Sequence, residues 1–413
     1  MNAQEKTFVI VGAGLAGARA AETLRDEGFD GGLILIGEET ERPYERPPLS
    51  KEYLRGEADS KPFVHDQDFY AENEIELWTS TRVMGIDLNS RELILEDDRR
   101  QRYARLLLAT GSTPRRLAVS GSDLPGIHYL RTLADSEEIA KRIEARERLV
   151  VVGSGWIGAE IAASARQKGC EVTVIERASL PLERVLGPEV GRIYRDIHRD
   201  HGVEFLPETT VERFEGSGRV ERVTTRDNAS IETEFVVVGI GVFPRTELLE
   251  ASGAAVDDGI LTDEALATSL PDVFAAGDVA NARHPRYGRR LRVEHWANAY
   301  NQGPAAARSM LGQEVAYDEI PYFFSDQYES GMEYGGYASE WDEVVFRGDV
   351  ADREFISFWV DEGRVIAGMN VNVWDVNESI RELIRSGAKV DLELLRDPDT
   401  PLEQLVSEEA GRR

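Results

Sequence analysis

The pattern with the clearest chemistry is G-x-G-x-x-G, which occurs twice, each time after a short apolar run: at Gly12, Gly14 and Gly17, and again at Gly153, Gly155 and Gly158. In such a motif the first glycine permits a tight turn, the second lets the backbone approach a pyrophosphate, and the third lets helix and strand pack closely. The helix N-terminus there presents unpaired N–H groups and a positive partial charge to phosphates. Two bound dinucleotides are therefore predicted.

An acidic residue follows each glycine motif by about 20 residues, Glu38 after the first and Glu176 after the second. A carboxylate at this place accepts hydrogen bonds from a ribose diol. Glu176 would also repel a 2′-phosphate, which favours NADH over NADPH. Arg177 and Arg184 lie close by in the sequence, so NADPH stays open as the less favoured nucleotide.

The two motifs require a strand, a helix and a second strand to position them. Each is preceded by a continuous apolar run, as expected of a strand buried on both faces of a parallel sheet. An Ala-rich helix and a second apolar run follow each motif: residues 16–27 and 33–36, then 157–168 and 172–175. Gly28 and Gly169 are predicted to end the two helices. We expect two parallel βαβ units with right-handed crossovers.

The pattern changes towards the end of the chain. Residues 235–238 predict a further strand and residues 296–310 a further helix. Beyond Pro321 the chain predicts meandering strands and a helix: residues 343–346, 355–360, 365–373 and 376–386. We infer a third, smaller α+β domain there.

Composition excludes several classes of protein. A chain of 413 residues suggests two or three domains, and a formal charge of −28 argues against nucleic-acid binding. The single cysteine, Cys170, cannot form an internal disulfide, a dithiol pair or a thiolate metal site, and no metal is predicted. Apolar runs are too short to span a bilayer, and no export signal is expected at the start. A cytoplasmic location is predicted.

Five further segments carry a resemblance to a known family: residues 46–51, 109–111, 129–133, 275–278 and 324–329. With the two glycine motifs, they make nearly the whole chain resemble the FAD-dependent pyridine nucleotide reductases, within them the ferredoxin reductases of bacterial P450 and Rieske oxygenase systems. The resemblance implies an α/β fold with two Rossmann-like dinucleotide-binding domains, as in glutathione reductase, and a small α+β C-terminal domain. It assigns FAD to the first motif and NADH to the second.

The same resemblance divides the chain into four segments. Residues 1–115 and 245–318 are expected to form the FAD-binding domain and residues 116–244 the NADH-binding domain. Residues 319–413 are expected to form a C-terminal domain that covers the flavin.

The site residues that the resemblance implies fall into two sets. The FAD set is Gly12, Gly14, Ala16, Gly17, Glu38, Arg46, Pro47, Lys51, Val83, Ala109, Thr110, Gly111, Arg131, Gly277, Asp278, Glu294 and Trp296. The NAD set is Gly153, Gly155, Trp156, Ile157, Gly158, Glu176, Arg184, Gly239, Ile240 and Gly241.

Two of these residues are expected to act directly on flavin reduction. By the resemblance, Lys51 lies beside the reactive edge of the flavin and pairs with Glu160. An ammonium there would favour the reduced, anionic flavin, and the carboxylate would keep a partly buried lysine charged. A surface lysine after a proline-rich turn is the alternative.

Other positions take more specific roles from the resemblance. Asp278 is expected to bind the ribityl chain of FAD, with a helix cap as the alternative, and Arg131 its phosphates, with a surface salt bridge as the alternative. The helix beginning near Trp296 is expected to point its positive end at the flavin N1, with Trp296 packing on the ring system. Phe324 departs from several relatives, which carry tryptophan there, and this puts the expected stacking over the flavin in doubt.

The predicted function is that of an NAD(P)H:ferredoxin oxidoreductase. Hydride passes from NADH to FAD, and single electrons then pass to a [2Fe–2S] ferredoxin that feeds a P450 or a Rieske oxygenase. The cofactors carry this chemistry, so no protein acid–base pair is assigned. Relatives that use a cysteine pair, or a redox cysteine near residues 42–46, are excluded because neither cysteine exists here.

Three other functions stay open. They are an NADH oxidase or monodehydroascorbate-type reductase, a rubredoxin reductase, and a redox-signalling flavoprotein resembling apoptosis-inducing factor. Five arginines lie within residues 283–292, and we expect them to dock an acidic ferredoxin if they are not a solvated loop: Arg283, Arg286, Arg289, Arg290 and Arg292. A monomer or a weak homodimer is predicted.

Overall fold

The computed structural model describes residues 6–405. They form two compact units, the first from residues 6–46, 60–113 and 242–319, and the second from residues 47–59, 114–241 and 320–405. The chain passes between the units five times, and two of these crossings lie at short strands, β8 (Ser112–Pro114) and β17 (Val242–Pro244). Within residues 6–405, no helix is both long and apolar enough to cross a bilayer. The four sequence segments given above stay a prediction.

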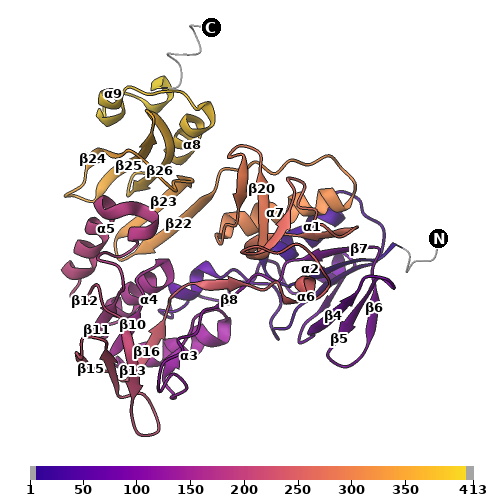
Figure 1. The fold of residues 1–413 in the computed structure, drawn as a ribbon, viewed down its shortest axis with the longest axis horizontal. Coiled ribbons are helices and arrows are strands. Elements are labelled where there is room, and N and C mark those ends of the chain that lie inside the picture. The colour runs from indigo at the N-terminus through magenta and orange to yellow at the C-terminus, as the bar shows by residue number, and fades with distance from the viewer. Residues whose placement is uncertain (1–5, 406–413) are drawn as a thin grey trace. The chain divides into compact units, whose positions relative to one another are not determined.

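The first unit is built on a parallel sheet (Figure 1). Its spatial order is β19 (Val273–Ala275), β7 (Arg105–Leu108), β1 (Phe8–Val11), β2 (Leu33–Ile36) and β3 (Ile75–Trp78). Residues 8–11 and 33–36 are buried along their whole length, as continuous apolar runs require in a parallel sheet. All four strand pairs are parallel, so the carboxyl ends of the five strands lie at one edge of the sheet.

Two Ala-rich helices pack together beside this sheet: α1 (Leu15–Asp26) and α7 (Trp296–Met310). Alanines from both helices lie in one buried cluster, and small side chains let the two backbones approach closely. Gly303 faces the carbonyl oxygen of Ala16 at a place where a methyl group would overlap it. The predicted helix at residues 296–310 has these bounds in the structure, whereas α1 begins and ends one residue before the predicted 16–27.

Smaller elements complete the first unit. The strands β4 (Val83–Asp87), β5 (Glu92–Leu95) and β6 (Arg100–Arg102) form an antiparallel sheet. A second small sheet contains β18 (Ile260–Thr262), β20 (Ala280–His284) and β21 (Arg289–Leu291). Short helical turns are α2 (Phe69–Glu72), α6 (Glu247–Glu250) and η3 (Gly277–Val279).

The second unit repeats the parallel plan. Its sheet has the order β12 (Glu204–Leu206), β11 (Val172–Ile175), β10 (Leu149–Val152), β16 (Phe235–Val238) and β9 (Ile127–His128). The helices α3 (Leu133–Glu144), α4 (Trp156–Gln167) and α5 (Glu183–Asp200) belong to it, with the short helix η2 (Pro47–Ser50). An antiparallel sheet of β13 (Val211–Glu215), β14 (Arg222–Thr225) and β15 (Ser230–Glu232) follows α5 and β12.

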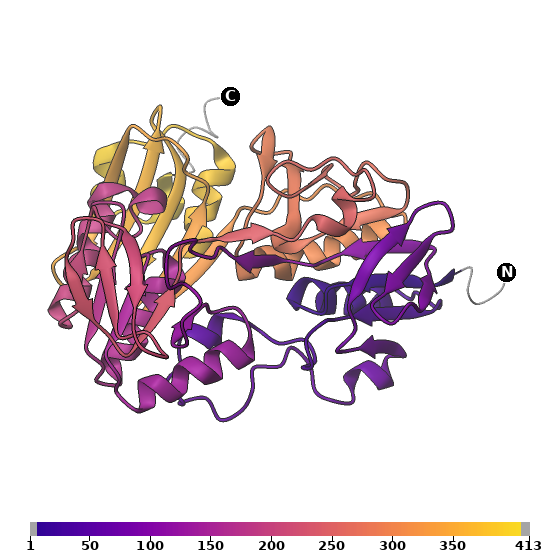
Figure 2. The same ribbon diagram turned by 60° about the horizontal axis from the view of Figure 1, so that its bottom comes forward.

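The C-terminal part of the second unit is a five-stranded antiparallel sheet, drawn in orange and yellow in Figures 1 and 2. Its order is β22 (Tyr322–Gln327), β23 (Ser330–Gly336), β26 (Arg364–Val371), β25 (Glu354–Asp361) and β24 (Glu343–Asp349). Helix α8 (Asn377–Ser386) packs on β26 and β23, and α9 (Leu392–Arg396) packs on β24. The strands and the helix expected beyond Pro321 are present.

Candidate functional site

The first glycine motif lies in the turn between β1 and α1. Gly12 has a φ of +117°, and a methyl group built on it would overlap the carbonyl oxygen of Ala109 at the end of β7. A methyl group on Gly17 would overlap the Gly12 carbonyl. At Gly14, by contrast, an added Cβ would meet no described atom within 4 Å. The first and third glycines therefore make close packing possible, and the second leaves open space at the N-terminus of α1.

Other predicted FAD residues gather at the same carboxyl edge of the first sheet. Glu38 follows β2, residues 109–111 follow β7, and Asp278 follows β19. Ser112 donates a 2.7 Å hydrogen bond to the Asp278 carboxylate, and the Gly277 N–H donates to buried Gln302 over 2.9 Å. Ligands of parallel α/β sheets bind at this edge, so the structure brings these residues together where a dinucleotide would bind.

Glu38 has a partner that the sequence did not predict. Arg245, just beyond β17, donates two hydrogen bonds to the Glu38 carboxylate, one of them over 3.0 Å. The backbone of Arg245 bonds to the loop after β7, because its carbonyl accepts from Thr110 over 2.8 Å and its N–H donates to Gly111. The Arg245 hydrogen bond holds the pKa of Glu38 below its ordinary value, although burial opposes this.

The start of α7 carries Trp296, whose ring stacks on Tyr300 with 4.8 Å between centroids. Glu294 forms an ion pair with Arg292.

Gly277 has a φ of +79°, and a methyl group built on it would lie against Ala16, so these two predicted FAD residues are close together in the first unit. The side chain of Val83 is buried in the core of this unit, and Arg46 pairs with Glu39 over 2.8 Å. The contacts of Trp296, Glu294, Val83 and Arg46 with a cofactor stay predictions.

The residues of this edge fit a bound dinucleotide. The N-terminus of α1 is capped by a glycine, its first turn has no acidic residue, and the space beside Gly14 is open. Unpaired backbone N–H groups and the positive end of the helix dipole favour a phosphate there.

The second glycine motif reproduces this geometry in the second unit. Gly153 has a φ of +95° and lies against the carbonyl of Gly239 at the end of β16. Gly158 lies against the Gly153 carbonyl, and an added Cβ at Gly155 would meet no described atom within 4 Å. The predicted NAD residues Ile157 and Ile240 are among the exposed large apolar side chains. Open space beside Gly155, with apolar side chains nearby in the chain, suits a nucleotide.

Glu176 is held by neighbouring uncharged groups. Its Oε2 accepts hydrogen bonds from the Ser154 N–H and hydroxyl, both over 2.7 Å. Its Oε1 accepts from the Ala178 N–H over 2.8 Å. The carboxylate is therefore fixed at the end of β11 by donors that carry no charge. Arg184 is exposed at the start of α5, and its contact with a nucleotide stays a prediction.

Lys51 and Glu160 form a buried ion pair in the second unit. Lys51 Nζ lies 2.8 Å from Glu160 Oε2, and both side chains are less than one-tenth exposed, at 6% and 3%. Ser50 and Ser325 also donate to this carboxylate, Ser325 over 2.6 Å. The centroid of the Phe324 ring lies 5.6 Å from Nζ. The predicted pairing of Lys51 with Glu160 is present, and the alternative of a surface lysine is wrong.

The position of Lys51 relative to the first glycine motif stays a prediction. Lys51, Pro47 and Arg131 belong to the second unit, whereas the other predicted FAD residues belong to the first. Within the second unit Arg131 lies just before α3, and its N–H donates to Asp135 over 3.1 Å.

Cys170 takes no part in a thiol site. Its side chain is buried, and burial raises the pKa of the thiol to about 11. A thiol in that state is a poor nucleophile at neutral pH. This agrees with the prediction that the chain has no cysteine-based redox chemistry.

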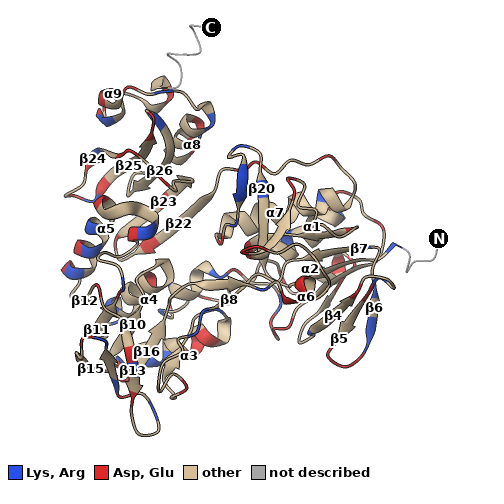
Figure 3. Ribbon diagram, viewed as in Figure 1, with Lys and Arg blue, Asp and Glu red and all other residues tan. Residues whose placement is uncertain are grey.

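The arginines at residues 283–292 are less uniformly exposed than the sequence suggested. Four of them lie on the strands β20 and β21 or between them, and Figure 3 marks this hairpin in blue. Arg292, however, is only 10% exposed in its side chain and pairs with Asp258 over 3.1 Å and with Glu294. Arg290 donates to the backbone carbonyls of Thr262 and Asn281. Arg292 therefore does not belong to an exposed basic surface, and that part of the prediction is wrong.

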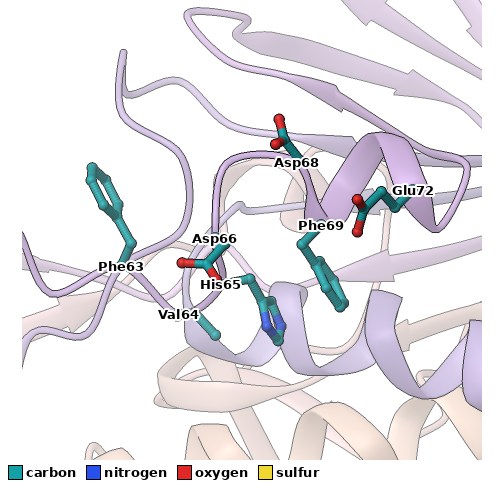
Figure 4. Close-up of a pocket in the computed structure, with 7 residues that line it drawn as sticks. All are labelled: Phe63, Val64, His65, Asp66, Asp68, Phe69 and Glu72. Atoms are coloured by element: carbon teal, nitrogen blue, oxygen red, sulfur yellow. The ribbon is translucent and has the colours of Figure 1, made fainter.

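An open pocket of about 460 Å³ lies elsewhere in the first unit (Figure 4). Its lining is Phe63, Val64, His65, Asp66, Asp68, Phe69 and Glu72. The rings of His65 and Phe69 stack with 3.7 Å between centroids. The pocket contains no predicted site residue.

Several polar side chains of these sites were not predicted from the sequence: Ser50, Ser112, Ser154, Arg245, Gln302 and Ser325. Ser50 and Ser325 stand inside segments that carried the family resemblance, so their hydroxyl groups were a usable signal. Arg245 and Gln302 are far in sequence from the residues they contact, and no local pattern indicates them.

Comparison with known proteins agrees with this geometry. The family model described as pyridine nucleotide-disulphide oxidoreductase matches residues 6–303, and a model described as reductase C-terminal matches residues 322–406. The chain belongs to the pyridine nucleotide-disulphide oxidoreductase family. The predicted family is confirmed.

Individual members of this oxidoreductase family match over nearly their full length. Putidaredoxin reductase of Pseudomonas putida is 37% identical over 98% of both chains. The ferredoxin–NAD(+) reductase component of the anthranilate 1,2-dioxygenase system of Burkholderia cepacia is 38% identical over 97% of this chain and 99% of that one.

Solved structures of the family match as well. The covalent putidaredoxin reductase–putidaredoxin complex matches with a TM-score of 0.94 at 36% identity, over 98% of this chain and 99% of the other. The ferredoxin reductase for the CYP199A2 system of Rhodopseudomonas palustris matches with a TM-score of 0.93 at 35% identity, over 97% and 100%. The predicted fold class is confirmed.

Proposed function

We propose that this chain is an NADH-dependent ferredoxin reductase with bound FAD. The observation that carries the proposal is shared by the two parallel sheets. At its carboxyl edge, each has an open second glycine at a helix N-terminus and an acidic residue after the next strand. We call these two places the nucleotide edges, the first in the first unit and the second in the second unit. The family shares this dinucleotide chemistry, and the similar proteins named above are reductases of putidaredoxin or ferredoxin.

The two edges take different nucleotides. The first edge holds FAD through the N-terminus of α1, with Glu38 at the ribose and Asp278 at the ribityl chain. The second holds NADH through the N-terminus of α4. The fixed carboxylate of Glu176 accepts from the ribose diol and repels a 2′-phosphate.

FAD, when bound, supplies the acceptor for a hydride and the donor of single electrons. The chain contributes position and charge. With FAD bound, the ammonium of Lys51 would stabilise negative charge on the flavin, and Glu160 holds that ammonium in place. Because the ion pair is buried, solvent screens its field less than that of a surface lysine.

The acceptor is a [2Fe–2S] ferredoxin that serves a P450 or a Rieske oxygenase. We place its docking surface at the exposed side chains of Arg283, Arg286 and Arg289. Charge reversal there raises the KM for the ferredoxin and weakens its salt dependence, while Arg219→Glu, at an exposed arginine of the second unit, is the control. An unchanged KM in all three variants contradicts this surface. A cytoplasmic location fits the single buried thiol.

The deciding experiment compares acceptors under steady-state turnover with NADH. We expect fast electron transfer to a [2Fe–2S] ferredoxin and much slower transfer to oxygen, ascorbyl radical or rubredoxin. Fast turnover with oxygen alone would identify an oxidase. Slow turnover with every acceptor, together with NADH-induced dimerisation, would identify a signalling flavoprotein.

A further inference from the structure

A row of buried polar side chains connects helix α5 to Lys51 inside the second unit. His198 Nε2 lies 2.9 Å from Gln327 Oε1, and Gln327 Nε2 donates to Ser325 Oγ over 3.2 Å. Ser325 in turn donates to Glu160, the partner of Lys51. His198, Gln327, Ser325 and Glu160 are all buried, with exposed fractions of 1% to 4%. We call His198, Gln327 and Ser325 the polar relay.

Every hydrogen bond of the polar relay points towards Glu160. The amide nitrogen of Gln327 donates to Ser325, so its carbonyl oxygen faces His198 and can only accept. Ser325 accepts a hydrogen bond from Gln327, and its hydroxyl donates one to the Glu160 carboxylate, which can only accept. His198 therefore donates from Nε2.

The state of His198 agrees with this direction. Burial lowers its pKa to about 4, so at neutral pH the ring is uncharged and carries a single N–H. With that proton on Nε2, Nδ1 is an acceptor, and the hydroxyl of Tyr328 lies 3.2 Å from it. With this single assignment of donors and acceptors, every hydrogen bond of the polar relay has one donor and one acceptor.

The local structure explains why these residues meet. Ser325 and Gln327 are two apart on β22, so their side chains lie on the same face of the strand. The last turn of α5 carries His198, and α4 carries Glu160 two residues after Gly158. The C-terminal sheet therefore supplies part of the surroundings of the Lys51–Glu160 pair.

We propose that Ser325, Gln327 and His198 are positioning residues that spread the negative charge of Glu160 and thereby set the field that Lys51 exerts on the bound flavin. Hydrogen bonds in a buried row polarise one another, so each donor increases the stabilisation of the carboxylate. Without the relay Glu160 keeps only its contacts with Ser50 and Lys51 in the described part of the chain, so its negative charge offsets more of the Lys51 charge and reduction of the flavin becomes less favourable. The last step of this proposal rests on the proposed function; the relay itself does not.

The relay is tested first in the full chain without any cofactor. Ser325→Ala, Gln327→Met and the double variant form a cycle whose midpoints of urea unfolding reveal coupling between the two sites. We expect a non-additive cycle, because Ser325→Ala removes the group to which Gln327 donates. Ser330→Ala is the matched control, since Ser330 is buried on the adjacent strand and its hydroxyl has no hydrogen-bond partner within residues 6–405. The additive reference cycle pairs Gln327→Met with Ser309→Ala, because Ser309 is buried in the first unit and its hydroxyl also has no hydrogen-bond partner among the described residues. Gln327→Leu replaces Gln327→Met if that variant does not fold.

The effect on the flavin is tested by the midpoint potential of bound FAD, measured with a chemical reductant. We expect Ser325→Ala to make reduction about tenfold less favourable, which is about 30 mV for a two-electron couple. Ser325→Thr keeps the hydroxyl and is expected to restore the wild-type potential, and Ser330→Ala is expected not to change it. A Ser325→Ala potential equal to that of Ser330→Ala, or an additive unfolding cycle, overturns the proposal.

The two failures are distinguishable. If the wild-type protein binds FAD and NADH reduces it while the potentials of all variants agree, the relay is wrong and the proposed function stands. If the wild-type protein takes up no FAD, the proposed function fails and the role of the relay at the flavin fails with it. The unfolding cycle then decides whether the relay exists.

Discussion

The two glycine motifs have nearly the same backbone geometry, yet the polar groups around them differ. In the first unit the acidic residue after the second strand, Glu38, is paired with an arginine. In the second unit the corresponding Glu176 is held by N–H groups and a serine hydroxyl. The first carboxylate is therefore paired with a cation, whereas the second is held by uncharged donors beside its binding edge.

A second difference lies on the helices that follow the motifs. Two residues after the third glycine, α1 carries Arg19, which pairs with Glu22 and lies over the ring of Tyr300. At the same place α4 carries Glu160, which is buried with Lys51. One backbone motif thus supports two chemistries, because side chains outside the glycines decide which charge each edge presents.

The largest effect is expected from removing the ion pair between Lys51 and Glu160 of α4. Lys51→Met with Glu160→Gln avoids leaving one buried charge without its partner, which would itself destabilise the protein. We expect flavin reduction by NADH to slow by about 100-fold, because removal of one such electrostatic group costs on the order of 10²–10³ in rate. Anaerobic stopped-flow absorbance measures this rate. The corresponding pair on α1, Arg19→Met with Glu22→Gln, is the control, and a double Lys51/Glu160 variant reduced at the wild-type rate would falsify the role.

The next effect separates the glycines by function. Gly17→Ala forces a methyl group into the Gly12 carbonyl and is expected to lower the free energy of unfolding by about 1–3 kcal/mol. Gly14→Ala has room in the protein, so we expect stability within about 0.5 kcal/mol of wild type but weaker FAD uptake. Chemical unfolding of the apoprotein and a flavin titration measure the two quantities. Equal destabilisation by both substitutions contradicts the assigned roles.

A smaller effect is expected in the choice of nucleotide. Glu176→Gln removes the negative charge from the second edge and keeps the shape of the side chain. The ratio of kcat/KM for NADH to that for NADPH is expected to fall at least about tenfold, since like charges in contact cost several kcal/mol. Glu38→Gln, measured with saturating FAD, is expected to leave that ratio unchanged. If Glu38→Gln lowered the NADH to NADPH ratio of kcat/KM as much as Glu176→Gln, the proposal that only the second edge selects the nucleotide would be contradicted.

The smallest effect is expected from Arg245→Met in the first unit. The pair with Glu38 is partly exposed, so its loss is expected to cost less than about 1 kcal/mol at neutral pH. The pKa of Glu38 is lowered in the folded protein. The pair therefore stabilises the folded state at pH values above the ordinary pKa of a glutamate, and this stabilisation is lost as the pH falls through the lowered pKa. Urea unfolding of both proteins at neutral and strongly acidic pH measures the difference. A difference that grows on acidification contradicts the assignment.

Much of this arrangement follows from local sequence. The apolar runs and glycine spacing predicted both βαβ units, because buried parallel strands and the turns after them place strict demands on residue type. The family resemblance predicted the pairing of Lys51 with Glu160. Helix ends moved by one residue, which is within the fraying of a last turn.

The missing parts depend on contacts between distant segments. Arg245 reaches Glu38, and Gln327 reaches His198, across more than a hundred residues of sequence, and no periodicity indicates such pairs. The predicted exposure of Arg292 is wrong for a similar reason, since its partner Asp258 lies well outside its local sequence. Side-chain partners of this kind are set by the packing of the whole unit.

The most direct test of the two unlike nucleotide edges is an anaerobic titration of the purified protein, first with NADH and in a parallel sample with NADPH. The account predicts a yellow protein whose flavin absorbance is bleached by stoichiometric NADH and much less readily by NADPH. A colourless protein that takes up no FAD, or equal bleaching by both nucleotides, would contradict it.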